Sequence, residues 1–291
     1  MLYTIGNEQL SVTISSYGAE LQSIRNSQGV EYLWQGNPIY WNDRAINLFP
    51  YVGRLTEGTY LLQNKRYQMD IHGFIKSSNF QAEQTSLRSV SFWFCDDTLT
   101  RMQYPYSFLY RESYEVSQGT IIITYEILNR CKHEMHFGIG GHPGFNVPLD
   151  VDLEFSDYYL EFSNACKPFR VGMSKECFVS GIDEPFPLIN GNILPLNHGL
   201  FVNDAIILTG MDSTVTLKCD KNDGAVSVCF PQMRYLGLWH KPNTDAPYLC
   251  IEPWASLPSR QGIIEDLEQQ PDLICLPVNE TYRNTWSIRI E

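Results

Sequence analysis

The sequence predicts an all-β protein built as a large antiparallel β-sandwich or barrel. Hydrophobic and polar residues alternate with a period of two through much of the chain. Turn-forming residues separate the alternating runs, and helical spacing occurs in a single short segment. Many short strands joined by regular turns, with almost no helix, are typical of sandwiches and barrels.

Four alternating runs are the clearest strand candidates. Successive side chains of a strand point to opposite faces, so one face of each run packs on a core. The buried faces are expected to carry Leu10, Val12 and Ile14; Ile121, Ile123, Tyr125 and Ile127; Val215, Leu217 and Cys219; and Trp286, Ile288 and Ile290. Turns are predicted at residues 26–29, 117–119, 189–192 and 222–224.

Two segments depart from simple alternation. The run over residues 153–162 changes phase in its middle, which predicts a β-bulge near Ser156 and Asp157. Residues 262–270 carry hydrophobic side chains at helical spacing, and Pro271 would end that helix. This segment is the one helix that we expect.

Composition limits the size class and the partners. The chain has 291 residues, 43% of them hydrophobic, which is enough for a large core and excludes disorder. No linker-like stretch and no repeat divides it, so we expect a single domain over residues 1–291. The net charge of −12 argues against nucleic acid and anionic membranes as partners, because those surfaces select basic patches.

The cysteines and the amino terminus suggest a compartment. The 8 cysteines are scattered without a C-x-x-C pair, which favours a reducing environment. The first residues lack the basic and apolar regions of a signal peptide, and no apolar stretch approaches the roughly 20 residues that span a bilayer. We therefore expect a cytoplasmic protein.

Four of the 6 histidines have contexts that indicate ordinary surface or hydrogen-bonded side chains. His133 and His136 are three residues apart, which on a strand places them on opposite faces and argues against a shared metal ion. The same ordinary interpretation applies to His198 and His240.

The other two histidines have unusual neighbours. Gly73, directly after His72, permits an uncommon backbone conformation or the close approach of a ligand. His142 follows three glycines and precedes Pro143, so this segment is expected to be a poor strand that presents the imidazole from a loop. Both histidines are candidates for a functional site.

One carboxylate also stands out. Glu252 lies in an apolar stretch between Ile251 and Trp254, so it is expected to be partly desolvated. Desolvation raises a carboxyl pKa toward the range that is useful for proton transfer. The alternative is a structural ion pair at the end of a strand, for example with Arg54.

Five short motifs together resemble the aldose 1-epimerase (galactose mutarotase) family, and more specifically its bacterial LacX-like branch. Each motif alone is weak, but the five occur in the family's order and span nearly the whole chain. The motifs are Asn47-Leu48-Phe49-Pro50-Tyr51-Val52-Gly53-Arg54, His72-Gly73-Phe74, Gly141-His142-Pro143-Gly144-Phe145, Asn203-Asp204-Ala205 and Cys250-Ile251-Glu252-Pro253-Trp254.

The resemblance implies a galactose-mutarotase-type supersandwich and an isomerase of carbohydrate metabolism. It makes Glu252 the general base and His142 the general acid that interconvert the α and β anomers of a free aldohexose by ring opening and closure. Arg54 and His72 would hold and polarise the sugar, and Asp204 would bind ring hydroxyls.

The resemblance further implies that Trp254 or another aromatic residue stacks on the C–H face of the sugar, and that rings such as Trp254 and Phe74 line the sugar cleft. It implies a small-molecule sugar as the partner, no metal and no organic cofactor, and a monomer or homodimer.

Departures from the family pattern leave alternatives open. The residues after His142 and after Trp254 differ from those in well-studied galactose mutarotases, so galactose specificity does not follow. A hexose-6-phosphate mutarotase is one alternative, with a phosphate held by a basic side chain. A non-catalytic carbohydrate-binding protein on the same fold is another. The candidate phosphate ligands are Lys76, Lys241 and Arg44.

Overall fold

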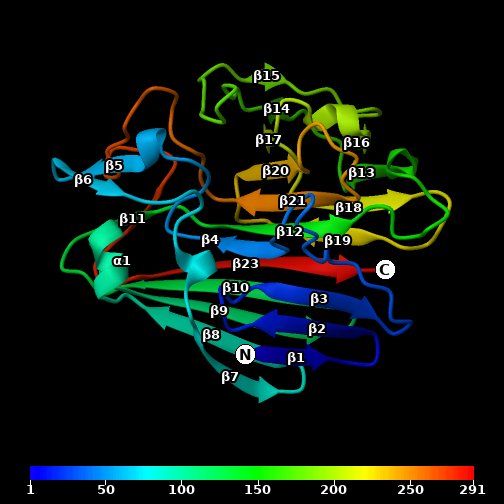
Figure 1. Ribbon diagram of the computed structural model, residues 1–291, viewed down its shortest axis with the longest axis horizontal. Helices are drawn as coiled ribbons and strands as arrows, with labels where there is room; N and C mark the ends of the chain where they lie inside the picture. The colour runs from blue at the N-terminus through cyan, green and yellow to red at the C-terminus, as the bar shows by residue number, and fades with distance from the viewer.

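The computed structural model describes residues 1–291 and confirms the predicted all-β antiparallel sandwich. Figure 1 shows the strands gathered into two large sheets with smaller sheets at their margins. The larger sheet has nine strands in the order β16 (Ile193–Pro195), β13 (Tyr158–Phe162), β18 (Thr214–Cys219), β19 (Val226–Cys229), β23 (Thr281–Ile290), β10 (Thr120–Asn129), β9 (Phe108–Ser117), β8 (Ser89–Cys95) and β7 (Gln81–Ser86).

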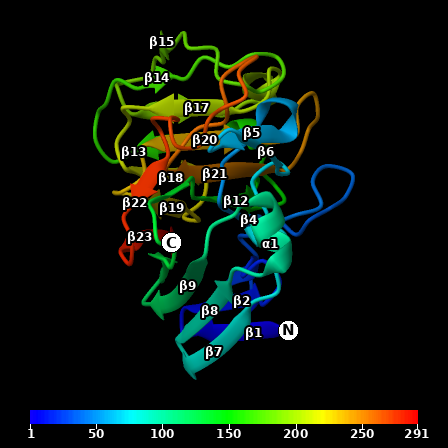
Figure 2. The ribbon, with the colours of Figure 1, turned by 90° about the vertical axis from the view of Figure 1, so that its left-hand side faces the viewer.

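The second large sheet carries the site described below. Its seven strands run in the order β15 (Glu184–Pro185), β14 (Phe169–Arg170), β17 (Ile206–Thr209), β20 (Tyr235–Trp239), β21 (Tyr248–Trp254), β12 (Gly140–Asn146) and β4 (Ala45–Leu48). Figure 2 shows β14, β17 and β20 at one end of the molecule and β7, β8 and β9 at the other.

Three smaller sheets complete the strands. A three-stranded sheet contains β1 (Leu2–Gly6), β2 (Leu10–Ser15) and β3 (Leu21–Asn26). Two ribbons pair β5 (Thr59–Leu62) with β6 (Lys65–Gln68), and β11 (Met135–Phe137) with β22 (Ile274–Leu276). The helices are short: α1 (Thr98–Gln103), η1 (Thr56–Gly58), η2 (Ile75–Ser77), η3 (Phe155–Asp157) and η4 (His198–Phe201). None of them is long and apolar enough to cross a membrane.

One hydrophobic core of 63 buried residues lies between the sheets. The four alternating runs predicted from the sequence supply its strands, and every side chain predicted to face the core is buried. The predicted turns are also present, with residues 117–119 joining the hairpin of β9 and β10. All 8 cysteines are free.

Strand β21 is buried on both faces, which determines where a site can form. Leu249 and Ile251 point into the main core. Cys250, Glu252 and Trp254 alternate with them and therefore face the opposite side of the seven-stranded sheet. Loops and a second, smaller cluster of buried side chains that includes Trp254 cover that outer face.

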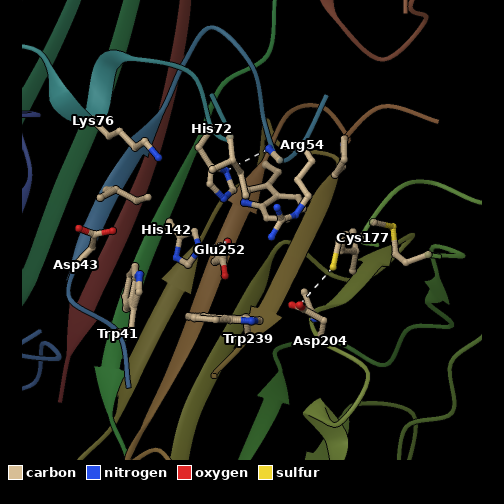
Figure 3. Close-up of a pocket in the computed structure, with 18 of the residues that line it drawn as sticks. Trp41, Asp43, Arg54, His72, Lys76, His142, Cys177, Asp204, Trp239 and Glu252 are labelled. Carbon is tan, nitrogen blue, oxygen red and sulfur yellow. Dashed lines mark hydrogen bonds and ion pairs between the residues drawn. The ribbon is translucent and has the colours of Figure 1, made fainter. Parts of the chain in front are cut away.

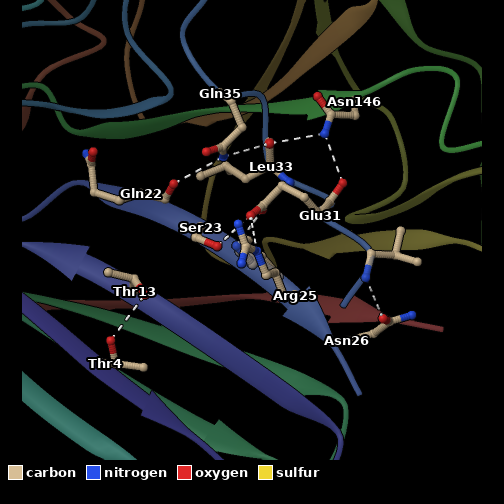
Figure 4. Close-up of polar contacts among 12 residues, drawn as sticks. Thr4, Thr13, Gln22, Ser23, Arg25, Asn26, Glu31, Leu33, Gln35 and Asn146 are labelled. Atoms are coloured by element: carbon tan, nitrogen blue, oxygen red, sulfur yellow. Dashed lines mark hydrogen bonds and ion pairs between the residues drawn. The ribbon is translucent and has the colours of Figure 1, made fainter. Parts of the chain in front are cut away.

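A polar network fastens the three-stranded sheet to β12 (Figure 4). The Glu31 carboxylate accepts hydrogen bonds from Ser23 Oγ at 2.5 Å and from Arg25 Nε at 3.0 Å, both on β3. The Glu31 carbonyl oxygen accepts one from Asn146 Nδ2 at 2.9 Å. Because Asn146 ends β12, this network helps to position the strand that carries His142.

Four local predictions are corrected by the structure. The phase change in residues 153–162 comes from the short helix η3, which ends where β13 begins, and not from a bulge. Residues 262–270 form turns instead of a helix, because their backbone hydrogen-bonds to β5: Leu61 N donates to Glu265 O, and Leu267 N donates to Leu61 O. The α-helix that does occur, α1, begins at a capping box formed by Asp97 and Thr100.

The third correction concerns His142, which lies within β12 and not in a loop. The glycine at position 141 of this strand is explained by packing. A Cβ at Gly141 would lie 2.7 Å from the Trp286 ring of the opposite sheet, so no larger side chain fits at that position. The fourth correction is Phe74, which is buried in the core against Phe49 and does not line a sugar cleft.

Candidate active site

The structure brings all six sequence-predicted site residues to one cavity on the outer face of the seven-stranded sheet (Figure 3). The cavity has a volume of about 270 Å³. This is just below the roughly 300–1,000 Å³ typical of drug-sized ligand sites, so it suits a small molecule. The six residues that line it are Arg54, His72, His142, Asp204, Glu252 and Trp254.

His142 and Glu252 meet because of strand register. Gly140 pairs with Trp254 and Gly144 pairs with Cys250, so His142 on β12 lies opposite Glu252 on β21. The distance from His142 Nε2 to Glu252 Oε2 is 3.2 Å. The contact does not have hydrogen-bond geometry, and neither Glu252 Oε2 nor His142 Nδ1 has another hydrogen-bond partner.

Burial shifts both members of this pair toward their neutral forms. Removal from water raises the pKa of Glu252 well above its ordinary value, and it lowers the pKa of His142 to about 3. Burial therefore favours the carboxylic acid over the carboxylate at Glu252, and the neutral imidazole over the imidazolium at His142. Perturbed groups that face each other in a cavity are typical of proton-transfer sites.

Aromatic rings hold the His142 imidazole from several sides. The Trp41 ring lies against it with a centroid distance of 4.9 Å, and the Trp239 ring meets it edge-on at 5.8 Å. His72 also meets it edge-on, at 5.4 Å. These contacts fix the orientation of the imidazole without using its ring nitrogens.

His72 is held as a neutral hydrogen-bond donor. Its backbone has a φ of 65°, and Gly73 follows with a φ of 72°, so the uncommon conformation predicted from this glycine is present. The Gly53 N–H donates to His72 Nδ1 at 3.1 Å, which leaves the ring proton on Nε2. Burial, aided by the nearby His142 and by basic groups, holds the pKa of His72 well below its usual range.

Asp204 lies across the cavity between η4 and β17. Its Oδ1 accepts a hydrogen bond from Ala205 N at 2.8 Å, and its Oδ2 accepts one from Cys177 Sγ at 3.3 Å. Burial and the Asp204 charge raise the pKa of Cys177 to about 11, so the thiol remains a donor at neutral pH. The carboxylate of Asp204 is thus oriented from the protein side.

Arg54 and Trp254 complete the predicted set. Arg54 follows Gly53 in the loop before η1, and its carbonyl oxygen accepts a hydrogen bond from Ser259 N at 3.0 Å. Figure 3 shows its side chain at the cavity, on the same side as His72. Arg54 forms no ion pair with Glu252, whose nearest basic partner is His142. Trp254 is 4% exposed and packs in the outer-face cluster.

Several cavity residues were not predicted from the sequence as site residues. Trp239 had a readable signal, because it alternates with the core residues Leu236 and Leu238 and must therefore face outward. Trp41, Asp43 and Cys177, by contrast, come from loops and had no periodic signal.

Of the three basic residues considered for a phosphate, the structure places only Lys76 in the cavity. Lys241 Nζ donates to Ile39 O, and Arg44 donates to Gln22 O.

His142, Cys250 and Glu252 also present donor atoms within 4.8 Å of one another, which is a possible metal-ligand set. A cation bound there would occupy ligand atoms of His142 and Glu252.

The fold and cavity define a class: an all-β sandwich protein whose outer sheet face holds a small cavity lined by a buried histidine and a buried glutamate. The chain belongs to the aldose 1-epimerase family, whose model, described as "Aldose 1-epimerase", matches residues 1–268. It is 30% identical over 298 residues to "Protein LacX, chromosomal" of Lactococcus lactis subsp. lactis, covering 100% of this chain and 99% of that protein.

Solved structures show the same fold. A galactose mutarotase related enzyme from Lactobacillus acidophilus is 31% identical, with a TM-score of 0.95 over 100% of this chain and 97% of that one. A galactose mutarotase-like protein from Lactobacillus casei ATCC 334 is 28% identical, with a TM-score of 0.93 over 100% of both chains. The predicted galactose-mutarotase-type sandwich is thereby confirmed.

Proposed function

We propose that the protein is an aldose 1-epimerase that interconverts the α and β anomers of a free aldohexose. The observation that carries this proposal is the His142–Glu252 pair, whose side chains lie 3.2 Å apart and line a cavity of about 270 Å³. Membership of the family supports the same reaction class.

Anomer exchange requires a base to remove the proton from the C1 hydroxyl and an acid to protonate the ring oxygen. In our proposal Glu252 is the base and His142 is the acid. This state has the same number of protons as the neutral pair, with the proton on the imidazole and not on the carboxyl group. For the transfer, the bound sugar must bring the 3.2 Å contact into hydrogen-bond geometry. The ring then opens to the aldehyde, C1 turns about the C1–C2 bond, and closure on the other face reverses both transfers.

The surrounding residues have separate roles in this proposal. The Arg54 guanidinium stabilises negative charge that develops on oxygen. The Nε2–H of His72 donates to a sugar oxygen, because its Nδ1 is already occupied by Gly53 N–H. Asp204 accepts from ring hydroxyls, and Trp254 offers an aromatic face to the C–H groups of the sugar.

The test is polarimetry on freshly dissolved α-glucose and α-galactose, with the uncatalysed rate subtracted. Glu252→Gln and His142→Ala should each lower the catalysed rate by about 10²–10⁴-fold, because each removes one positioned proton-transfer group. Glu161→Gln, at a partly exposed position of β13, is the matched control and should retain full activity.

Three outcomes would count against the proposal. Wild-type protein no faster than buffer would refute catalysis on those sugars. Full activity in both site variants would refute the assigned roles. Sugar binding measured by calorimetry without anomer exchange would establish the non-catalytic carbohydrate-binding alternative.

A hexose 6-phosphate is the second candidate substrate, and Lys76 is the observation that favours it. Its side chain lines the cavity, and burial lowers its pKa while Asp43 and Asp70 oppose that shift. The acidic Asp43 and Asp204 line the same cavity, which favours the neutral sugar. NMR exchange rates on glucose and glucose 6-phosphate separate the two candidates.

The proposal extends to the setting of the reaction. We place it in carbohydrate metabolism in the cytoplasm, with residues 1–291 acting as one domain and as a monomer or homodimer. Proton transfer between Glu252, His142 and the sugar accounts for the reaction without a metal or an organic cofactor.

A further inference from the structure

A second cluster of metal-ligating side chains lies on the ribbon of β11 and β22, outside the sugar cavity. His136 is the middle residue of β11, and it pairs directly with Cys275 on β22. Glu134 lies two residues before His136, directly before β11 begins. The donor atoms of these three residues all lie within 4.8 Å of one another.

The backbone around His136 is well anchored. Met135 and Phe137, on either side of it, are fully buried in the main core. The carbonyl oxygen of His136 accepts a hydrogen bond from the Tyr104 hydroxyl at 2.7 Å. His136 is therefore presented from a rigid strand, whereas Glu134 and Cys275 are exposed and free to adjust their side chains.

His136 also carries an unsatisfied polar atom. Its Nδ1 is buried and has no hydrogen-bond partner. A buried polar atom without a partner normally requires an explanation, because its desolvation is not compensated. If a cation binds at this nitrogen, the missing partner is supplied.

The donor set selects the kind of ion. A thiolate, an imidazole and a carboxylate are ligands of Zn²⁺, whereas Ca²⁺ and Mg²⁺ take oxygen ligands. With Zn²⁺ bonds of about 2.0–2.3 Å, tetrahedral ligand atoms lie about 3.3–3.6 Å apart. The donor atoms lie within 4.8 Å of one another, so each pair must move closer by at most about 1.5 Å to bind Zn²⁺. Rotation of the exposed Glu134 and Cys275 side chains can supply this movement.

We propose that Glu134, His136 and Cys275 form a Zn²⁺-binding site, with a water molecule in the fourth position. Cys275 binds as the thiolate, so its proton is released to solvent when the metal binds. The bound ion joins β11 to β22, which are more than a hundred residues apart in the chain. Ion binding therefore stabilises the folded protein. The inference does not depend on the proposed function.

The test is a Co²⁺ titration of the full chain, kept reduced with a phosphine. We expect a near-ultraviolet thiolate-to-cobalt band and visible bands of tetrahedral cobalt, both removed when Zn²⁺ is added. Cys275→Ser should abolish the thiolate band and lower Zn²⁺ affinity at least about tenfold, since loss of a ligand exceeds loss of an outer-shell partner. Cys95→Ser, at another exposed cysteine, is the matched control and should retain the thiolate band and the Zn²⁺ affinity.

The possible outcomes are decisive. Absence of the thiolate band in the wild-type protein would overturn the proposal. Persistence of the band in Cys275→Ser would also overturn it, because the thiolate would then come from elsewhere, for example from Cys250 beside the acid–base pair. Since Cys275 is exposed, unfolding of the Cys275→Ser variant is not expected, and circular dichroism checks this directly.

Discussion

Glu112, on β9, is a carboxyl group inside the sandwich core, and its titration should be measurable as a change in stability. Its side chain is inaccessible to solvent, and its Oε1 lies 2.5 Å from the Tyr114 hydroxyl. That hydroxyl also contacts Ala19 O at 2.8 Å. The Tyr114 hydroxyl has a single proton, and the Ala19 carbonyl oxygen can only accept. Both contacts are therefore hydrogen bonds when Tyr114 donates to Ala19 O and the protonated Glu112 carboxyl group donates to the Tyr114 oxygen.

The size of the effect follows from the pKa shift. Burial raises the pKa of Glu112 from 4.5 to about 8. The contribution of the neutral group is therefore fully present below pH 4.5 and is lost as the pH rises toward 8. Each pH unit in that window is worth about 1.4 kcal/mol, so the loss between pH 5 and pH 8 is on the order of 3–4 kcal/mol.

Glu112→Gln is the appropriate change, because glutamine has the same shape, does not titrate, and its amide can donate to Tyr114 as the carboxylic acid does. We expect the variant to have a free energy of unfolding close to that of the wild type at pH 5. At pH 8 it should be more stable by about 3 kcal/mol. Glu115→Gln, at an exposed position of the same strand, is the control and should show a constant difference.

The measurement is urea unfolding followed by fluorescence at several pH values between 5 and 8. The slope of the free energy against urea concentration should be unchanged, which confirms that the variant alters stability and not the unfolded state. If the wild-type and Glu112→Gln free energies remain parallel across this range, Glu112 is ionised in the folded protein and the reasoning is wrong.

Two further predictions concern the site and its strand. Because burial lowers the pKa of His142 to about 3, the acid limb of the catalysed anomer-exchange rate should lie below pH 5; a limb near 6.5 would show an ordinary histidine. Gly141→Ala should destabilise the protein by about 1–3 kcal/mol in urea unfolding, because the new Cβ would lie 2.7 Å from the buried Trp286 ring. Gly224→Ala, where the nearest atom would be 3.6 Å away, should change stability little, and equal effects would contradict the packing argument.

The strand pattern was predictable because one face of each strand is buried in a common core. The period of two is clear in β10, where the buried residues Ile121, Ile123 and Ile127 alternate with less buried residues. Side-chain periodicity predicts the wrong structure where the backbone hydrogen-bonds to residues far away in the chain. Residues 262–270 have helical spacing, but their backbone hydrogen-bonds to Leu61, about 200 residues earlier.

The six proposed site residues were found through motif resemblance and unusual local context, and the structure places them at one cavity. Their common location was not visible in the alternation itself, since they come from three loops and two strands. Trp41 and Cys177 had no local signal, because only the folding of their loops over the sheet brings them to the cavity.

The sequence by itself determined the all-β class, the core faces of the main strands and the chemical types available for acid–base work. These properties depend on side-chain period and residue identity, which are local. Only the tertiary structure decided that His142 lies opposite Glu252 at 3.2 Å, because that distance depends on the register between β12 and β21. It also decided the direction in which both pKa values shift, since the desolvation that causes the shifts exists only when the loops cover the outer face of the sheet.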